Sequence, residues 1–386
     1  MISLNRPYDI KSTCAGKPHP WEERGMEITY SSREGLSRIY RLLYEERGAL
    51  RVAVSPLTCF IAIYPIVANG HTLVFVDIDP ETLNMSEEAL MAHEDVDAVQ
   101  TIYLGGNPMR MDKVMNWAKK HGVVVIEDCA QALGASYKGQ LCGTFGEFAV
   151  ASAVKNLYAV CGGLLVSQKC PTIDPRLIEG SKTIRPVLMV YKHVKRWLEK
   201  RADARKGNIW NAAYWGLLKL KDTQENGFAN CIHRVPTDVE KEIRAALGQI
   251  EAIQAERTRK AERLIAQIDS TKYRLQQVPE GGESTRNRVI VVALHREARE
   301  VIGALRAKGI AANNLTQSYT HSYQEHVRLN EVLGRFYPPL HTHTHTWRAE
   351  LSNYEKIFPY VISIPCSPAL TDKEIDYIAN CLNTLN

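Results

Sequence analysis

Between residues 50 and 170, short apolar runs rich in β-branched residues alternate with segments of helical spacing, and this alternation limits the folds open to the chain. A short, fully apolar run bounded by polar residues is typical of a strand buried on both faces. Such strands, separated by helices, indicate an α/β domain whose mainly parallel sheet is covered on both sides. Six runs fit this description: Arg51–Val54, Thr72–Val76, Ala98–Leu104, Val123–Ile126, Glu147–Ser152 and Gly163–Val166.

The segment 109–122 lies between the third and fourth of these runs and has the clearest helical pattern. Its apolar residues recur on one helical face from Met111 to Ala118. Gly122 follows where a C-terminal cap is expected. This strand–helix–strand order supports a large α/β domain.

A second helical pattern begins near residue 236. Pro236 and Asp238 are typical of a helix start, and apolar residues continue at helical spacing. We therefore expect one long helix, from Val239 to about Ile268, that connects two domains.

The last third of the chain has the pattern of a small α+β unit. An apolar run at 289–294 predicts a strand, and the segments 296–309 and Asp372–Leu385 predict helices. We therefore expect a large domain at residues 1–250 and a small C-terminal domain at residues 251–386, which includes the connecting helix.

Composition excludes several classes of protein. A chain of 386 residues with 45% hydrophobic content is typical of a two-domain globular protein, and its net charge of +5 gives no strong attraction to nucleic acid. The nine cysteines include no C-x-x-C pair, so we expect buried reduced thiols and no metal site. The N-terminus lacks the apolar run of a signal peptide, and no run reaches the roughly 18 apolar residues of a membrane-spanning helix. We therefore expect a cytoplasmic protein.

Asp128 follows four apolar β residues, at the predicted carboxyl end of a buried strand. Ligands bind at that edge in open α/β sheets. A buried carboxylate is costly unless a cation meets it, and a protonated pyridine nitrogen would be such a cation. The alternative is that Asp128 only caps the helix that follows.

Lys155 lies 27 residues beyond Asp128, in mostly apolar surroundings before Gly162–Gly163. Desolvation lowers the pKa of a lysine in such surroundings, so more of it is a neutral nucleophile able to form an imine. The paired glycines allow the backbone to approach a ligand closely. The alternative is a lysine at a strand end whose amine reaches solvent.

Several fragments of the chain carry a family resemblance. The chain resembles the DegT/DnrJ/StrS nucleotide-sugar aminotransferases in four fragments, which are, in order, VFVDIDPETLNM, YLGGNPMRMDKV, IEDCAQALGASYKGQLCGTFGE and KNLYAVCGG. The resemblance is dense from Ser31 to Ser167 and weaker towards the C-terminus. It implies the fold of the pyridoxal 5'-phosphate (PLP)-dependent transferases of fold type I, in which a large PLP domain is followed by a small α+β domain. It also implies a homodimer whose active sites are shared between subunits.

The resemblance assigns roles by matching position. Lys155 resembles the Schiff-base lysine, which holds PLP as an internal aldimine and moves a proton at the donor α-carbon. Asp128 resembles the partner of the pyridine nitrogen, whose charge makes PLP an electron sink. Gln131 resembles the residue near the ring hydroxyl.

The resemblance also implies a phosphate site. Ser31, Ser32 and Arg33 occupy the helix start that presents backbone N–H groups to the cofactor phosphate in the family, and an anion is favoured at a helix N-terminus. An ordinary N-cap is the alternative, and both roles can coexist. Thr58 matches a threonine of a loop near the cofactor.

Some positions depart from the family pattern. Val150 stands where a phosphate-binding serine is usual, so we expect Ser152 to replace it. The aromatic residue that stacks on the PLP ring would fall at Cys59, so we expect Phe60 or a shifted Leu57 to substitute.

Two further departures concern the same pocket. Leu133 stands where a histidine is usual. The asparagine that reaches the phosphate of the neighbouring subunit should lie near Arg234, where strict alignment gives Ile232 and Asn230 is the nearest candidate. These departures predict an unusual substrate or an activity that has drifted.

Two segments keep open interpretations. Lys182–Lys221 carries eleven Lys or Arg residues against two acids. It could contact a membrane surface or a phosphorylated, lipid-linked acceptor, or form a packed insertion, at about 182–225, with a solvated basic face. His341, His343 and His345 could share a strand face as a metal trio, but we expect a solvated loop that contacts the sugar.

The sequence therefore predicts an enzyme that moves an amino group from an amino-acid donor, glutamate by resemblance, to a keto-sugar that is nucleotide-linked. One alternative is a sugar dehydratase of the same fold, but those relatives carry histidine in place of the lysine. The other is a non-catalytic partner or regulatory subunit, which the altered pocket positions favour.

Overall fold

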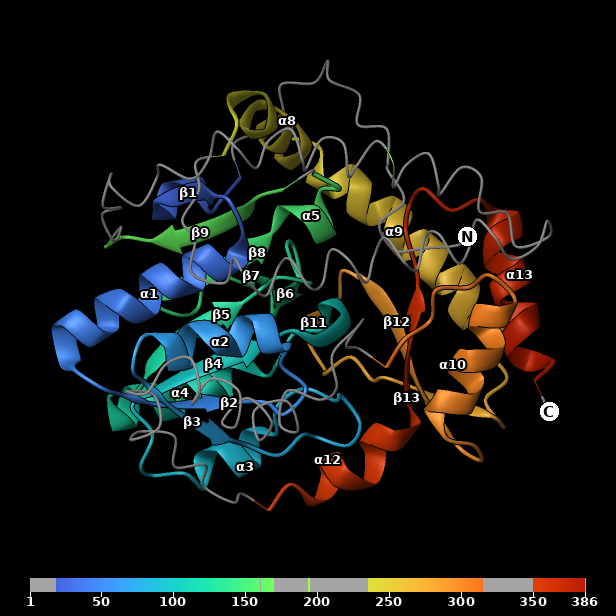
Figure 1. Ribbon diagram of the computed structural model, residues 1–386, viewed down its shortest axis with the longest axis horizontal. Coiled ribbons are helices and arrows are strands. Elements are labelled where there is room, and N and C mark those ends of the chain that lie inside the picture. Colours follow the sequence, from blue (N-terminus) through green and yellow to red (C-terminus); the bar gives the residue numbers. More distant parts are fainter. Residues whose placement is uncertain (1–18, 160, 170–193, 195–234, 315–349, 386) are drawn as a thin grey trace.

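The structure is a computed structural model that describes residues 19–159, 161–169, 194, 235–314 and 350–385 (Figure 1). Its centre is a seven-stranded sheet in the order β1-β9-β8-β5-β4-β2-β3. The strands are β1 (Met26–Thr29), β2 (Arg51–Val54), β3 (Thr72–Phe75), β4 (Ala98–Ile102), β5 (Val124–Asp128), β8 (Phe148–Ser152) and β9 (Gly163–Ser167).

One strand of this sheet runs against the other six. β2 is parallel to β3 and β4, and β5 is parallel to β4 and β8. β9 is antiparallel to both β8 and β1, so it alone is reversed. The predicted mainly parallel sheet is confirmed, and each predicted run matches a strand to within two residues at either end.

Helices cover both faces of the sheet, as the apolar runs required. α1 and α2 share a core with Val52 and Val54 on one face, whereas α4 and α8 share a core with Ala53 on the other. Successive strand residues point to opposite faces, so strands buried on both sides carry no polar alternation. The helices of this unit are α1 (Ser32–Arg47), α2 (Phe60–Ala68), α3 (Glu87–Met91), α4 (Met111–His121), α5 (Ala153–Asn156) and α8 (Thr237–Leu247).

α4 confirms the helix predicted at 109–122. Its buried face includes Met111, Val114 and Ala118. Gly122 follows with φ 68°, in the left-handed region that favours glycine, and its N–H donates to the carbonyl of Ala118.

The C-terminal part forms a three-stranded antiparallel sheet in the order β10-β12-β13. Val289 and Val291 of β12 point into the core of this unit, whereas Ile290 and Val292 join the α1–α2 core of the large sheet. The predicted small α+β unit is therefore present, and the predicted boundary at residue 250 stays a prediction. Its elements are β10 (Tyr273–Leu275), β12 (Arg288–Ala293), β13 (Val361–Pro365), α9 (Ile250–Ile265), α10 (Ala298–Ala307), α12 (Ser352–Ile357) and α13 (Asp372–Asn383).

The expectation of one long connecting helix is wrong. The chain forms two helices, α8 and α9, which are interrupted at Gly248 and Gln249. Gln249 has φ −116° and ψ 12°, outside the helical region, and glycine before it lowers the local helix propensity. α8 packs on the large sheet, while α9 reaches the small unit beside α13 (Figure 1).

A third, small sheet joins the two parts of the chain. Its order is β11-β6-β7, and Glu283 pairs with Ser136 in the segment that follows Asp128. The remaining short elements are β6 (Ser136–Tyr137), β7 (Gln140–Leu141), β11 (Gly282–Glu283) and the 3-10 helices Glu22–Arg24, Leu104–Gly106 and Phe358–Tyr360.

Several predictions lie outside the described residues: the insertion at about 182–225, Asn230, and the histidines 341, 343 and 345. The six cysteines of the described part form no disulfide, and all but Cys59 are buried. Within the same part, no group of three or more His, Cys, Asp or Glu side chains could hold a metal ion. None of the described helices has the length and apolarity that crossing a membrane requires.

Candidate active site

Asp128 is the last residue of β5, at the carboxyl edge of the large sheet. The parallel strands β8, β4 and β2 end at the same edge. The side chain is 7% exposed, and its Oδ1 accepts a hydrogen bond from the N–H of Ala130 (2.9 Å). This bond closes a local turn, whereas the alternative expected a helix cap, and the next element along the chain is the strand β6. Among the described residues no second donor to the carboxylate is found, so it keeps acceptor capacity for a ligand.

Lys155 lies in the short helix α5, directly after β8. Ser152 ends β8, and its hydroxyl accepts the N–H of Lys155 (3.3 Å) as the N-cap of α5. Asp128 pairs in register with Val150 of β8, so the sheet brings the two segments together. Ser152 therefore positions the Lys155 turn, and its predicted contact with a phosphate stays a prediction.

Asp128 and Lys155 are close enough to interact electrostatically. Burial raises the pKa of the Asp128 carboxyl, and the Ala130 N–H and the Lys155 charge oppose that rise. Tyr40 of α1 lies near the same carboxylate. Burial and the charge of Asp128 raise the pKa of Tyr40, and its hydroxyl donates to Gln100 Oε1 (2.6 Å). The site thus holds a buried carboxylate with the cation of Lys155 nearby.

Asn156 connects the two turns, a role that the sequence analysis did not assign. Its Nδ2 donates to the carbonyls of Ala130 (3.0 Å) and Ser152 (2.9 Å). Its own carbonyl accepts from Nη2 of Arg257 in α9 (3.0 Å). Asn156 follows Lys155 in the KNLYAVCGG fragment, which was the available signal.

The paired glycines bring β9 against the start of α1. A Cβ on Gly163 would lie 2.2 Å from the backbone nitrogen of Ser32, so only glycine fits there. Gly162 has φ 118°, and its N–H donates to the carbonyl of Tyr30 (2.8 Å). Ser31 is the N-cap of α1, since its hydroxyl accepts from the N–H of residue 34 (3.2 Å). The N-cap interpretation is confirmed, and the phosphate role of Ser31, Ser32 and Arg33 stays a prediction.

Gln131 is held beside the same edge of the sheet. Its Oε1 accepts from the N–H of Gly105 (3.0 Å), and its carbonyl accepts from the hydroxyl of Thr285 (3.1 Å). Leu133 is fully buried, and its carbonyl accepts from the side-chain amide of Gln254. Thr285 and Gln254, which both follow residue 250, thus fix the turn after Asp128.

Thr58 and Cys59 follow β2 and begin α2. Thr58 is 1% exposed, and its hydroxyl is buried with no hydrogen-bond partner in the described structure. Cys59 is half-buried and is the N-cap residue of α2, without a side-chain cap bond. Leu57 lies in the apolar core, and the side chain of Phe60 is outside the description. The stacking role therefore stays a prediction.

Glu127, the neighbour of Asp128, points to the opposite face of the sheet. Its carboxylate accepts from the hydroxyl of Tyr103 and from the N–H groups of Gly143, Phe145 and Gly146, at 2.5–2.7 Å. Burial raises the pKa of Glu127, and these four bonds oppose the rise. Glu127 therefore fixes the G-x-F-G loop, residues 143–146, to the end of β5.

The small sheet contributes residues that the sequence analysis missed. Asn287 donates from Nδ2 to the carbonyl of Lys155 (3.2 Å). Its neighbour Arg288 is 6% exposed, and burial lowers the pKa of its guanidinium to about 10, with the Cys59 thiol opposing that change. Because the lowered value is still far above neutral pH, Arg288 remains a cation at this edge.

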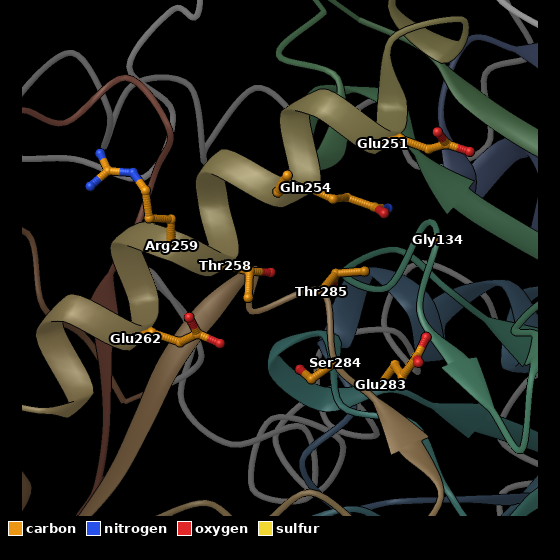
Figure 2. Close-up of a pocket in the computed structure, with 10 residues that line it drawn as sticks. Gly134, Glu251, Gln254, Thr258, Arg259, Glu262, Glu283, Ser284 and Thr285 are labelled. Atoms are coloured by element: carbon orange, nitrogen blue, oxygen red, sulfur yellow. The ribbon is translucent and has the colours of Figure 1, made fainter.

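A cavity of about 430 Å³ is lined by residues of α9, by the segment 283–285 and by Gly134. Figure 2 shows these residues around it. Neither Lys155 nor Asp128 lines it. Glu251, Glu262 and Glu283 give its wall a negative character, and Arg259 is engaged by ion pairs outside the cavity. This cavity is therefore distinct from the Asp128–Lys155 site.

Comparisons with known proteins agree with this architecture. The model of the DegT/DnrJ/EryC1/StrS aminotransferase family matches residues 35–223. A pleiotropic regulatory protein of Geobacillus stearothermophilus is 33% identical over 177 residues, 39% of this chain and 47% of that protein. The chain thus spans about half the length of this curated relative.

Two further relatives match more of the chain. The dTDP-4-dehydro-2,3,6-trideoxy-D-glucose 4-aminotransferase of Saccharopolyspora spinosa is 24% identical over 85% of this chain and 76% of its own. The sugar aminotransferase CalS13 from Micromonospora echinospora superposes with a TM-score of 0.64, at 20% identity, over 94% of this chain and 89% of its own. The match spans the sheet edge that carries Asp128 and Lys155, and over residues 35–223 the chain matches the DegT/DnrJ/EryC1/StrS aminotransferase family.

Proposed function

We propose that the protein is a PLP-dependent aminotransferase that moves an amino group from an amino-acid donor to a keto-sugar. By family resemblance the donor is glutamate and the sugar is nucleotide-linked. The observation that supports this most directly is the pairing of a buried carboxylate, Asp128, with the charge of Lys155 at the carboxyl edge of the sheet.

The residues present fit PLP. Thr58 offers a buried hydroxyl without a partner, and Asp128 keeps acceptor capacity for a protonated ring nitrogen. Gly163 lets β9 approach the first turn of α1, whose N–H groups favour an anion. When bound, PLP supplies an aldehyde that captures amines and a ring that accepts electrons.

Each residue of the site has a separate task. The Lys155 amine would hold the cofactor, and it is the group that could carry a proton to and from the donor α-carbon. Asp128 would keep the ring nitrogen protonated, and its burial would strengthen that attraction. Ser152 and Asn156 fix the turn that carries the amine, because both bond the backbone around it.

Replacement of Lys155 by Ala tests the proposal. The wild-type protein should show the near-visible absorbance of protein-bound PLP, and borohydride should fix the cofactor to the peptide that contains Lys155. The variant should lose both signals, since no other amine is proposed to hold the cofactor. Lys169→Ala, at an exposed lysine paired with Glu46, is the matched control. A Lys155→Ala variant that keeps the full reducible band would contradict the assignment.

Two alternatives make different predictions in the same preparation. Glutamate added to PLP-loaded protein should yield the aminated cofactor for a transaminase. For a dehydratase the product to look for is a deoxygenated sugar, but Lys155 stands where those relatives carry histidine. A regulatory subunit is favoured by the name of the Geobacillus relative and by the altered pocket positions, and it would not retain PLP through gel filtration.

A further inference from the structure

The helix that carries Lys155 is too short to pair its own carbonyls. α5 spans only four residues, and the carbonyls at the end of a helix have no partner inside it. The carbonyl of Ala153 accepts from the N–H of Leu157 (2.9 Å). The carbonyls of Lys155 and Asn156, one turn later, each accept a hydrogen bond from a distant side chain. The backbone around the lysine is therefore held from outside its own helix.

Both of these side chains belong to the C-terminal part of the chain. Asn287, just before β12, donates from Nδ2 to the carbonyl of Lys155 (3.2 Å). Arg257 of α9 donates from Nη2 to the carbonyl of Asn156 (3.0 Å), and Figure 1 shows α9 passing beside α5. The donors follow their acceptors by 132 and 101 residues in the sequence. Two separate elements of the C-terminal part thus hold one short turn of the large domain.

Arg257 makes few bonds for a buried guanidinium. Its side chain is 0% exposed, and its Nε and Nη1 have no hydrogen-bond partner within the described structure. Its Nη2 has neutral partners, the carbonyl of Asn156 and the hydroxyl of Tyr158 (3.1 Å). A buried cation with only neutral partners is costly. Since a side chain that served stability alone would not leave two donors unpaired, the contacts with the lysine turn indicate a role in function.

Tyr158, the second partner of Arg257, has an unfavourable backbone conformation. Its φ is 58°, in the left-handed region that is costly for any residue with a Cβ. The Arg257 guanidinium lies over the Tyr158 ring, with 5.7 Å between the guanidinium carbon and the ring centroid. Strained residues of this kind persist only where their surroundings hold them. Arg257 therefore contacts both the end of α5 and the strained residue that follows it.

We propose that Arg257 and Asn287 are positioning residues, which fix the direction of the Lys155 amine by holding the carbonyls of α5. The inference rests on the proposed transaminase function, and it adds that the packing of the C-terminal part sets where the amine lies. A general acid or base must lie within hydrogen-bond reach of the reacting atom. A misplacement of about 1 Å can lower a rate roughly a hundredfold.

The first test needs neither cofactor nor activity. Hydrogen exchange is measured on the peptide of residues 153–159 in wild type, Arg257→Met and Asn287→Ala. We expect the amides of this peptide to exchange roughly tenfold faster in each variant, because the turn loses an anchoring bond. Lys260→Met is the matched control. It removes a buried cation of the same helix whose amine bonds Asp372 of α13, and it should leave the peptide unchanged.

The second test separates positioning from support of the fold. PLP-loaded protein is mixed with saturating glutamate, and the loss of the near-visible absorbance is followed over a single turnover. We expect the rate constant per bound PLP to fall roughly ten- to a hundredfold in both variants, with little change in the glutamate KM. Glutamate deuterated at the α-carbon should give a larger isotope effect than in wild type, because proton transfer becomes slower relative to the other steps. Arg257→Lys, which keeps a donor, should recover part of the rate.

The outcomes distinguish this inference from the proposed function. If exchange rises but the rate per bound PLP and the isotope effect stay at wild-type values, the two residues only support the fold and the positioning inference is overturned. If neither measurement changes, it is overturned as well. A wild-type protein that does not react with glutamate would instead contradict the transaminase proposal. If Arg257→Met does not fold, Arg257→Lys and Asn287→Ala carry both tests.

Discussion

The two faces of the sheet at the end of β5 use the same chemical group in opposite ways. Glu127 and Asp128 are consecutive carboxylates, both buried, and they point to opposite faces. Within the part of the chain that the structure describes, Glu127 accepts four hydrogen bonds, whereas Asp128 accepts one, from Ala130. Burial raises the pKa of both, so burial does not distinguish them.

The two carboxylates differ in their remaining capacity to accept hydrogen bonds. The donors around Glu127 are three backbone N–H groups and a phenol, all within the protein, so this side is complete without a ligand. Asp128 faces the side that carries Lys155, and its remaining acceptor capacity has no donor among the described residues. The Glu127 side is therefore a structural support, and the Asp128 side is a site that a ligand completes.

The largest effect is expected for Glu127→Gln. A glutamine amide presents N–H groups to at least one of the three backbone N–H donors, which then stay buried without an acceptor. We expect the free energy of unfolding to fall by about 2–3 kcal/mol. Urea unfolding followed by circular dichroism measures it. Glu147→Gln, an exposed neighbour, is the control and should change little. A Glu127→Gln variant as stable as wild type would remove the contrast between the two faces.

The fold was largely predictable from the sequence, because periodicity reports burial. Runs such as Arg51–Val54 and the helix ending at Gly122 follow from local pattern alone. The reversed direction of β9 did not, since an apolar run looks the same in either direction. The break at Gly248 was also missed, because the apolar spacing continues across it.

The site was predictable only where a residue ends a strand or belongs to a recognised fragment. Asp128 and Lys155 were found in this way. Arg288 and Arg257 were not, because their partners lie 75 and 101 residues away in the sequence. Thr58 was named by resemblance, but that its hydroxyl lacks a partner is a property of packing and could not be predicted.

A smaller loss of stability is expected for Asn156→Ala, because Asn156 bonds the turns that carry Asp128 and Lys155. The change removes two donors, to the carbonyls of Ala130 and Ser152, and so separates the Asp128 turn from the Lys155 turn. We expect the free energy of unfolding to fall by about 1–2 kcal/mol. Urea unfolding measures this loss, and PLP titration by absorbance should show weaker binding. Asn69→Ala, an amide at the end of α2, is the control and should leave PLP binding unchanged. If PLP bound equally well to Asn156→Ala, the residue would support the backbone without positioning the lysine.

The smallest change in stability is expected for Asp128→Asn in the protein without cofactor, and this change is a gain rather than a loss. Asparagine keeps the oxygen that accepts from Ala130 but carries no buried charge, and the lost attraction to Lys155 offsets part of the gain. We expect the variant to be more stable at neutral pH by about 0.5–1 kcal/mol.

The pH dependence supplies the sign of this effect. Burial raises the folded pKa of Asp128, so the folded protein retains this proton to a higher pH than the unfolded chain does. The penalty is absent below the unfolded pKa of about 3.9 and grows as pH rises through the folded pKa. The advantage of Asp128→Asn should therefore increase with pH in urea unfolding from pH 4 to 8. Asp112→Asn should show no such gain over this range, because the hydrogen bond from Lys138 lowers the pKa of Asp112, so its carboxyl is ionised in both the folded and the unfolded state. If the two variants behaved alike, Asp128 would be a satisfied structural carboxylate like Glu127, and the contrast across β5 would fail.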